Sequence, residues 1–366
     1  MNAQEEFRNF LEYYYLDYNV LTSIITFYEN QNNSVYQTSF LLYTILNSLY
    51  DMQKICIPYS FAHIWDIKSG TKYYDRKINI IKDMSKGWYI TEDEKQGMYV
   101  RVDKCGDIDQ HFKEIYDSMK ITENVNSIFN PSIELAFEKS ILYNYYEKIL
   151  PQAVNEKIIN IYKEKKVKSL NDIFQFSYKI INILNVRNTI NLNIGSKDEL
   201  VKIIDLHIKN NLLLNQMRVK NIFDFETFYL KSIETIQQTE FSKKIFMYSI
   251  LCDYIGITRE SKKKIDKENF VTGMINDLLH LSYGMRCPIF VTNDKNLRIK
   301  AIICKILCNL NVKIFSIKNF YHYILNEYGK IKYPDKNNKE FSISCNIEGK
   351  TIIKIIKTDY EKIFFD

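Results

Sequence analysis

The chain has 366 residues, of which 46% are apolar and 26% charged, as in folded proteins with a full hydrophobic core. It has only 10 glycines and 5 prolines, too few for the turns of a β-sandwich, barrel or propeller, and too few for a linker-rich or disordered chain. The net charge of +6 gives a mild preference for anionic partners, although lysines that only keep a protein in solution give the same value.

The N-terminal part of the chain predicts alternating strands and helices. Aromatic and β-branched residues favour buried strands, helical spacing of apolar residues favours helices, and Ser60 and Gly70 are typical start and stop signals of a helix. The expected elements are a strand within residues 13–21, helices through 24–28 and 40–49, a strand over 54–59 and a helix over 60–67.

The middle of the chain predicts a small hairpin and then helices. Residues 88–90 and 98–102 flank a polar loop, which is typical of two antiparallel strands. From about residue 108 to 241 the apolar residues recur with helical spacing almost throughout.

The C-terminal part again alternates helices and strands. The expected elements are helices over 246–251 and 275–281, a strand over 288–291, a helix over 296–310, a strand over 312–315, a helix over 317–328 and a terminal hairpin within 341–365. Alternation of strand and helix implies a parallel sheet of βαβ units. We therefore expect an α/β fold in which both ends of the chain build one small parallel sheet flanked by helices.

This pattern divides the chain into four segments. Residues 1–70 and 240–330 form the two halves of the α/β core, and residues 71–239 form a mostly helical insertion that contains the hairpin near 88–102. Residues 331–366 form a C-terminal hairpin extension. The chain has no apolar stretch long enough to span a membrane, a polar N-terminus and scattered cysteines, so we expect a cytoplasmic protein without a membrane partner.

Four aspartates are expected near the carboxyl ends of the strands, where ligands of parallel sheets collect. Asp17 and Asp294 each follow a predicted strand, and Asp66 lies in the helix after the second strand. Asp277 lies in the helix that leads into the strand before Asp294. We expect the four carboxylates to meet at one edge of the sheet.

Such a group of carboxylates predicts a hard divalent cation. Mg²⁺ and Mn²⁺ prefer oxygen ligands and keep several waters, and without a metal the carboxylates would repel each other. A bound ion can activate water for attack on a phosphodiester. Each aspartate alone also has a structural interpretation: Asp17 can cap a helix, Asp277 can lie on an exposed helix face, and Asp294 can form a turn with Asn293.

The segments around these aspartates resemble the acidic motifs of PIN-domain nucleases. The matching segments are Tyr-Leu-Asp-Tyr-Asn-Val-Leu (15–21), Asn-Asp-Leu-Leu-His (276–280) and Phe-Val-Thr-Asn-Asp-Lys-Asn-Leu (290–297). The segment 59–67 is similar to the Ser-x-x-His-x-x-acid helix of a bacterial branch of PIN-like proteins. That family usually has Glu as the second acid, so Asp66 departs from its pattern. The resemblance covers about residues 13–70 and 271–325.

The resemblance implies a PIN-like core and a metal-dependent endoribonuclease. Asp17, Asp66, Asp277 and Asp294 would be catalytic ligands of one or two Mg²⁺ or Mn²⁺ ions, and single-stranded RNA the substrate. Related enzymes act in stress response, toxin–antitoxin pairs or phage defence, so a protein partner or a homo-oligomer is also expected. Two alternatives stay open: the same site acting on DNA or tRNA, and an inactive PIN-like module that binds RNA or protein.

Other residues near the motifs are expected to support the acids or contact substrate. His63 and His280 share a helix face with Asp66 and Asp277, three residues away, and are interpreted as partners of those carboxylates. The full set of supporting residues is Asn19, Ser60, His63, His280, Thr292 and Asn293. A basic run can bind phosphates, although such runs are usually solvated helix faces; its members are Lys262, Lys263, Lys264 and Lys267.

Overall fold

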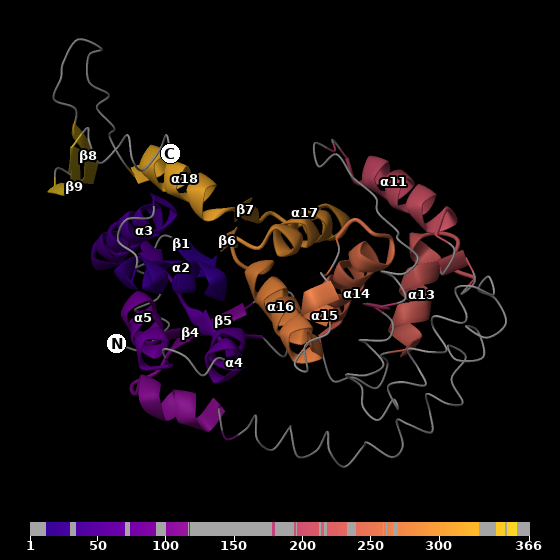
Figure 1. Cartoon of the computed structure of the whole chain (residues 1–366), viewed down its shortest axis with the longest axis horizontal. Helices are drawn as coiled ribbons and strands as arrows, with labels where there is room; N and C mark the ends of the chain where they lie inside the picture. The colour runs from indigo at the N-terminus through magenta and orange to yellow at the C-terminus, as the bar shows by residue number, and fades with distance from the viewer. Residues whose placement is uncertain are drawn as a thin grey trace, which may run out of the picture. The chain divides into compact units, whose positions relative to one another are not determined.

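The computed structural model divides the chain into two compact units, which are described separately below (Figure 1). The first unit comprises Met1–His111, Tyr283–Arg298 and Asn311–Asp366, and the second comprises Phe112–Ser282 and Ile299–Leu310. The structure describes residues 12–29, 34–69, 74–92, 100–115, 117, 178–179, 194, 196–211, 214–215, 218–232, 239–258, 260, 262–265, 270–328, 342–347 and 350–356.

A four-stranded parallel sheet lies at the centre of the first unit. Its strands are β2 (Ile55–Cys56), β1 (Glu12–Leu16), β6 (Ile289–Val291) and β7 (Lys313–Phe315), in this order across the sheet. All three neighbouring pairs are parallel. Leu16 lies opposite Val291, and Val291 opposite Phe315, so β1, β6 and β7 end at the same edge. The sheet confirms the predicted α/β architecture.

The strands of this sheet are buried because their side chains are large and apolar or aromatic. Tyr14, Tyr15 and Phe290 are fully buried, and Tyr15 packs against the ring of Phe290 with centroids 5.9 Å apart. Helices α2 (Tyr18–Glu29) and α3 (Ser34–Asp51) pack on each other, and α18 (Ile317–Tyr328) packs on α3 and β7. Burial of aromatic surface at this scale is the main stabilising contribution to such a core.

A second, mixed sheet and a terminal hairpin complete the first unit. The mixed sheet has the order β3 (Tyr59–Ser60), β4 (Trp88–Glu92), β5 (Val100–Lys104); β3 and β4 are parallel, and β4 and β5 are antiparallel. Between β3 and β4 the chain forms α4 (Phe61–Ser69) and α5 (Tyr74–Ser85), which pack on each other. Strands β8 (Ser342–Ile347) and β9 (Lys350–Ile356) pair antiparallel. Both predicted hairpins are confirmed.

The second unit is helical where the structure describes it. It contains α11 (Lys197–Lys209), α13 (Ile222–Ser232), α14 (Glu240–Tyr254), α15 (Lys262–Ile265) and most of α16 (Phe270–Gly284) and α17 (Lys295–Cys308). From Phe241 to Asp253 every residue of α14 except Lys243 and Lys244 is buried, so this helix forms the core of the unit. Much of the predicted helical insertion lies outside the described residues.

Two predicted strands differ from the structure. The strand expected within 13–21 ends at Leu16, because the carbonyl of Asp17 accepts the N–H of Val20 and opens helix α2. The strand expected over 54–59 divides into β2 and β3, which belong to different sheets. Pro58 lies between them and has no N–H to donate to a ladder, which explains the break.

The division into units also differs from the four predicted segments. Residues 71–111, which the sequence assigned to the insertion, are grouped with the parallel sheet in the first unit. No helix within the described ranges has both the length and the apolar character needed to cross a membrane.

Candidate functional site

The ends of two adjacent strands bring Asp17 and Thr292 into contact in the first unit. Asp17 follows β1, and its backbone N–H donates to the carbonyl of Val291 at 2.9 Å. Thr292 follows β6, and its Oγ1 donates to Oδ2 of Asp17 at 2.6 Å. The Asp17 side chain is only 4% exposed. The first predicted acid is thus a buried carboxylate that the neighbouring strand holds in place.

Asn19 connects this carboxylate to the loop after β6. Its Nδ2 donates to Oδ2 of Asp17 and, at 3.1 Å, to Oγ1 of Thr292. Its Oδ1 accepts the backbone N–H of Asn293 at 2.9 Å. The structure therefore brings together three of the supporting residues that the sequence predicted, Asn19, Thr292 and Asn293, around Asp17.

Asp294 lies at the start of helix α17 and is half-buried. Its Oδ1 accepts the N–H of Leu297 at 2.9 Å, which is the bond of a helix N-cap, and its own N–H donates to Oγ1 of Thr292 at 3.1 Å. Its Oδ2 makes no hydrogen bond or ion pair within the described part of the chain. One carboxylate oxygen of Asp294, Oδ1, therefore fixes the side chain, and among the described residues none occupies the other oxygen, Oδ2.

His63 fixes the end of strand β1, one residue before Asp17. Its Nδ1 accepts the backbone N–H of Ser60 at 3.0 Å, so we assign the ring proton to Nε2, which donates to the carbonyl of Leu16 at 2.7 Å. The hydroxyls of Ser60 and Tyr15 share a hydrogen bond of 2.8 Å. The ring nitrogens of His63 thus bind Ser60 and Leu16, and the predicted pairing of His63 with the Asp66 carboxylate stays a prediction.

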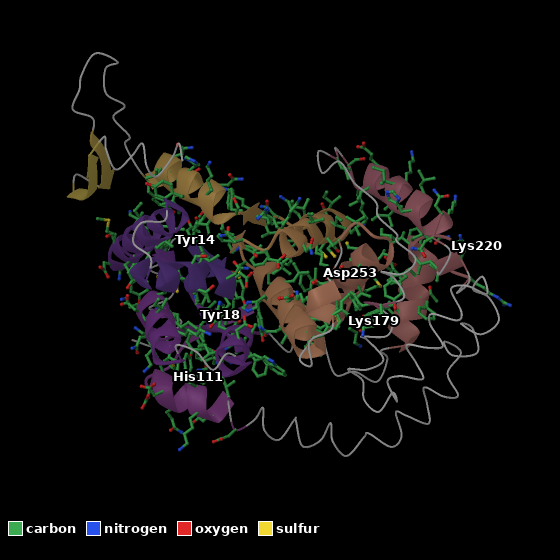
Figure 2. The ribbon with its side chains drawn as sticks, in the orientation of Figure 1. Tyr14, Tyr18, His111, Lys179, Lys220 and Asp253 are labelled. Carbon is green, nitrogen blue, oxygen red and sulfur yellow. The ribbon has the colours of Figure 1, made fainter. Side chains whose placement is uncertain are left out.

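Asp66 lies on α4, half-buried, beside a lysine that the sequence analysis did not single out. Burial lowers the pKa of Lys77 on α5, and the nearby Asp66 carboxylate opposes that shift. The Nζ atom of Lys77 also lies 5.4 Å from the ring centroid of Tyr18, the residue after Asp17. Figure 2 labels Tyr18 in the first unit. The ammonium group of Lys77 is therefore close enough to the Asp66 carboxylate to interact with it electrostatically.

Asp277 belongs to the second unit, where it is in an ion pair. The Nζ atom of Lys264 lies 3.0 Å from Oδ2 of Asp277 and 3.1 Å from Oε2 of Glu260. Burial lowers the pKa of Lys264, but the two carboxylates outweigh burial and raise it overall. Lys264, expected to bind phosphate, thus contacts an expected metal ligand. His280 is buried on the same helix, and the side chains of Lys262, Lys263 and Lys267 lie outside the described residues.

The second unit also contains a buried ionic cluster that sequence reasoning missed. Lys300 Nζ lies 2.7 Å from Oδ2 of Asp253, and both side chains are less than a tenth exposed (Figure 2 labels Asp253). Tyr178 donates to Oδ2 of Asp253 at 2.6 Å, and Thr258 donates to Oδ1 at 2.5 Å. The available signal was Asp253 itself, the one acid in the apolar run 248–257.

The donors of the first unit fit a hard divalent cation. Asp17 and Asp294 present carboxylate oxygens at the ends of adjacent strands, and Mg²⁺ needs only one or two carboxylates because it keeps several waters. Within the described ranges no group of three or more His, Cys, Asp or Glu side chains is placed to hold a metal ion. The described residues therefore form no closed cage of protein ligands.

Comparisons with known proteins provide no relative of this chain. No family model matches it, no curated protein matches it, and no solved structure matches it. Any assignment of function therefore rests on the α/β architecture, the sequence motifs and the contacts described above.

Proposed function

We propose that the first unit is a PIN-like nuclease core and that the protein is a metal-dependent endoribonuclease acting on single-stranded RNA in the cytoplasm. The observation that carries this proposal is the contact between the two strand ends: Thr292 binds Asp17 through its hydroxyl and the N–H of Asp294 through the same oxygen. Two carboxylates at adjacent ends of parallel strands are the arrangement that the PIN resemblance requires.

Asp17 and Asp294 would hold Mg²⁺ or Mn²⁺, and Asp66 of the same unit is a further proposed ligand. The ion, when bound, lowers the pKa of a coordinated water and polarises the phosphodiester. The products would carry 5′-phosphate and 3′-hydroxyl ends, because water and not the substrate 2′-hydroxyl would supply the attacking oxygen.

The residues around the acids would hold both carboxylates in a fixed orientation. Thr292 and Asn19 donate to the Asp17 carboxylate, and hydrogen bonds to the charged form of an acid favour that form. The N-cap bond to Leu297 fixes Asp294 at the positive end of helix α17, where a negative charge is stabilised. The carboxylates of Asp17 and Asp294 would thus be preorganised for binding a cation.

Cleavage of a labelled RNA oligonucleotide with Mn²⁺ tests the proposal. We expect the wild type to cleave, EDTA to stop cleavage, and Asp17→Asn and Asp294→Asn to reduce the rate by at least about 100-fold. Asp198→Asn, an exposed acid on α11, is the matched control and should cleave like the wild type. Intact RNA with the wild type, or full activity of both site variants, would contradict the proposal. Equal cleavage of a DNA oligonucleotide would favour the DNA-directed alternative.

A further inference from the structure

We propose that Lys77 is a further catalytic residue, whose ammonium group binds the scissile phosphate of the RNA. This inference rests on the proposed function. Lys77 lies on helix α5, outside every segment that resembles the PIN motifs, and no sequence argument singled it out.

The ammonium group of Lys77 lies close to the segment that follows Asp17. Its Nζ lies 5.4 Å from the ring centroid of Tyr18, the first residue of α2, and Tyr18 directly follows Asp17. An ammonium at this distance from an aromatic face is attracted to it, so Tyr18 holds the side chain. Helix α5 packs on α4, which carries Asp66, and on α2, which begins directly after Asp17, so both helices support Lys77.

Lys77 is near the Asp66 carboxylate but forms no ion pair with it within the described residues. Asp66 acts on it electrostatically, yet Lys77 forms no ion pair within 4.0 Å in the described ranges. Two other cations are engaged: Lys264 bridges two carboxylates, and Arg298 donates to the carbonyl of Thr292 at 3.1 Å. Among the described side chains, none therefore binds the Lys77 ammonium group at ion-pair distance.

A lysine ammonium group suits the chemistry of phosphodiester cleavage. Attack on a phosphodiester builds negative charge on the phosphoryl oxygens, and a fixed cation near that charge stabilises the transition state. Lys77 is partly buried, and a partly desolvated charge acts more strongly than one in bulk water. Lys77 would add a second positive charge to that of the proposed ion and so further offset the repulsion between the acids and an anionic substrate.

The test compares Lys77→Met and Lys77→Arg with a control on the same helix, Lys82→Met, which removes a lysine that pairs with the largely exposed Asp109. Lys77→Met should lower kcat about 100-fold, with Mn²⁺ affinity and melting temperature unchanged. Lys77→Arg should recover much of the activity, and Lys82→Met should match the wild type. A kcat of Lys77→Met within threefold of the wild type would overturn the proposal, and so would a loss that follows Mn²⁺ affinity or the melting temperature.

A binding measurement separates failure of this inference from failure of the proposed function. If the wild type cleaves no RNA, the proposed function fails and Lys77 is judged by RNA binding in Ca²⁺, measured against salt concentration. Lys77→Met should then weaken binding and lower the slope of log affinity against log salt by about one, the signature of one lost phosphate contact. An unchanged slope would overturn the inference.

Discussion

Thr292 donates a 2.6 Å hydrogen bond to Asp17, although 275 positions of sequence separate the two residues. The same hydroxyl oxygen accepts hydrogen bonds from Asn19 and from the N–H of Asp294. One threonine therefore connects both acids of the proposed site, and the parallel pairing of β1 and β6 makes this contact geometrically natural.

Replacing this hydroxyl by a methyl group should destabilise the protein. Thr292→Val keeps the shape of the side chain but removes a donor from a buried carboxylate, and loss of a hydrogen bond to a charged group costs about 1.5–3 kcal/mol. Urea unfolding measures the change. Thr227→Val, which removes an exposed hydroxyl on α13, should stay within about 0.5 kcal/mol of the wild type. Equal stability of both variants would contradict the structural role of Thr292.

Alanine substitution at two glycines of helix α16, Gly273 and Gly284, should change the stability of the protein in opposite directions. A Cβ on Gly284 would lie 2.4 Å from the Phe290 ring, whereas a Cβ on Gly273 would have nothing within 4 Å. Gly284→Ala should cost at least about 1–3 kcal/mol because it overpacks the core. Gly273→Ala should stabilise by about 0.5–1 kcal/mol because alanine favours the helix. Thermal unfolding compares them, and a stabilising Gly284→Ala would contradict the close approach of Gly284 to the Phe290 ring.

Removing one partner of the buried Lys300–Asp253 ion pair should strongly destabilise the second unit. Lys300→Met leaves the Asp253 carboxylate buried without its cation, which costs about 3–5 kcal/mol. Adding Asp253→Asn should recover part of this loss, because no unpaired charge then remains. A double-mutant cycle in denaturant measures the coupling. Additive effects of the two substitutions would show that the pair does not act as a unit.

Glu260 should make stability depend on pH in the acid range. Burial raises the pKa of Glu260 in the folded protein, although Lys264 and Lys300 oppose the shift. The folded state therefore holds this proton at a pH where the unfolded state, with a pKa of about 4.3, has lost it. The contribution of Glu260 to the free energy of unfolding should thus grow as pH falls through the folded pKa.

Unfolding curves of the wild type and Glu260→Gln between pH 4 and 8 measure this dependence. The wild type should gain stability relative to the variant as pH decreases. Glu240→Gln is the control, because Glu240 also pairs with a lysine but is 74% exposed. A wild-type advantage that shrinks toward low pH would contradict the raised pKa.

Local patterns predicted much of the first unit. The apolar spacing over 317–328 gives helix α18 with the bounds that the structure has, because its buried residues recur on one face. The placement of Asn19, Thr292 and Asn293 near Asp17 followed from one rule, that parallel strands end at one edge. Such features depend on residues close in sequence or on strand direction.

Contacts between helices that are distant in the chain could not be predicted from the sequence. The Lys264–Asp277 and Lys300–Asp253 pairs depend on how helices pack, which no local periodicity encodes. His63 was placed on the correct helix, but its bonds to Ser60 and Leu16 depend on how the chain crosses from β2 to β3. Lys77 was missed because a lysine on an amphipathic helix resembles a solvated residue until its neighbours are known.

Calorimetric titration of the purified protein with Mn²⁺ tests the central claim most directly. We expect saturable binding by the wild type and by Asp198→Asn, and its loss in both Asp17→Asn and Asp294→Asn. A wild type that binds no Mn²⁺, or site variants that bind it as tightly as the wild type, would show that these two aspartates form no metal site.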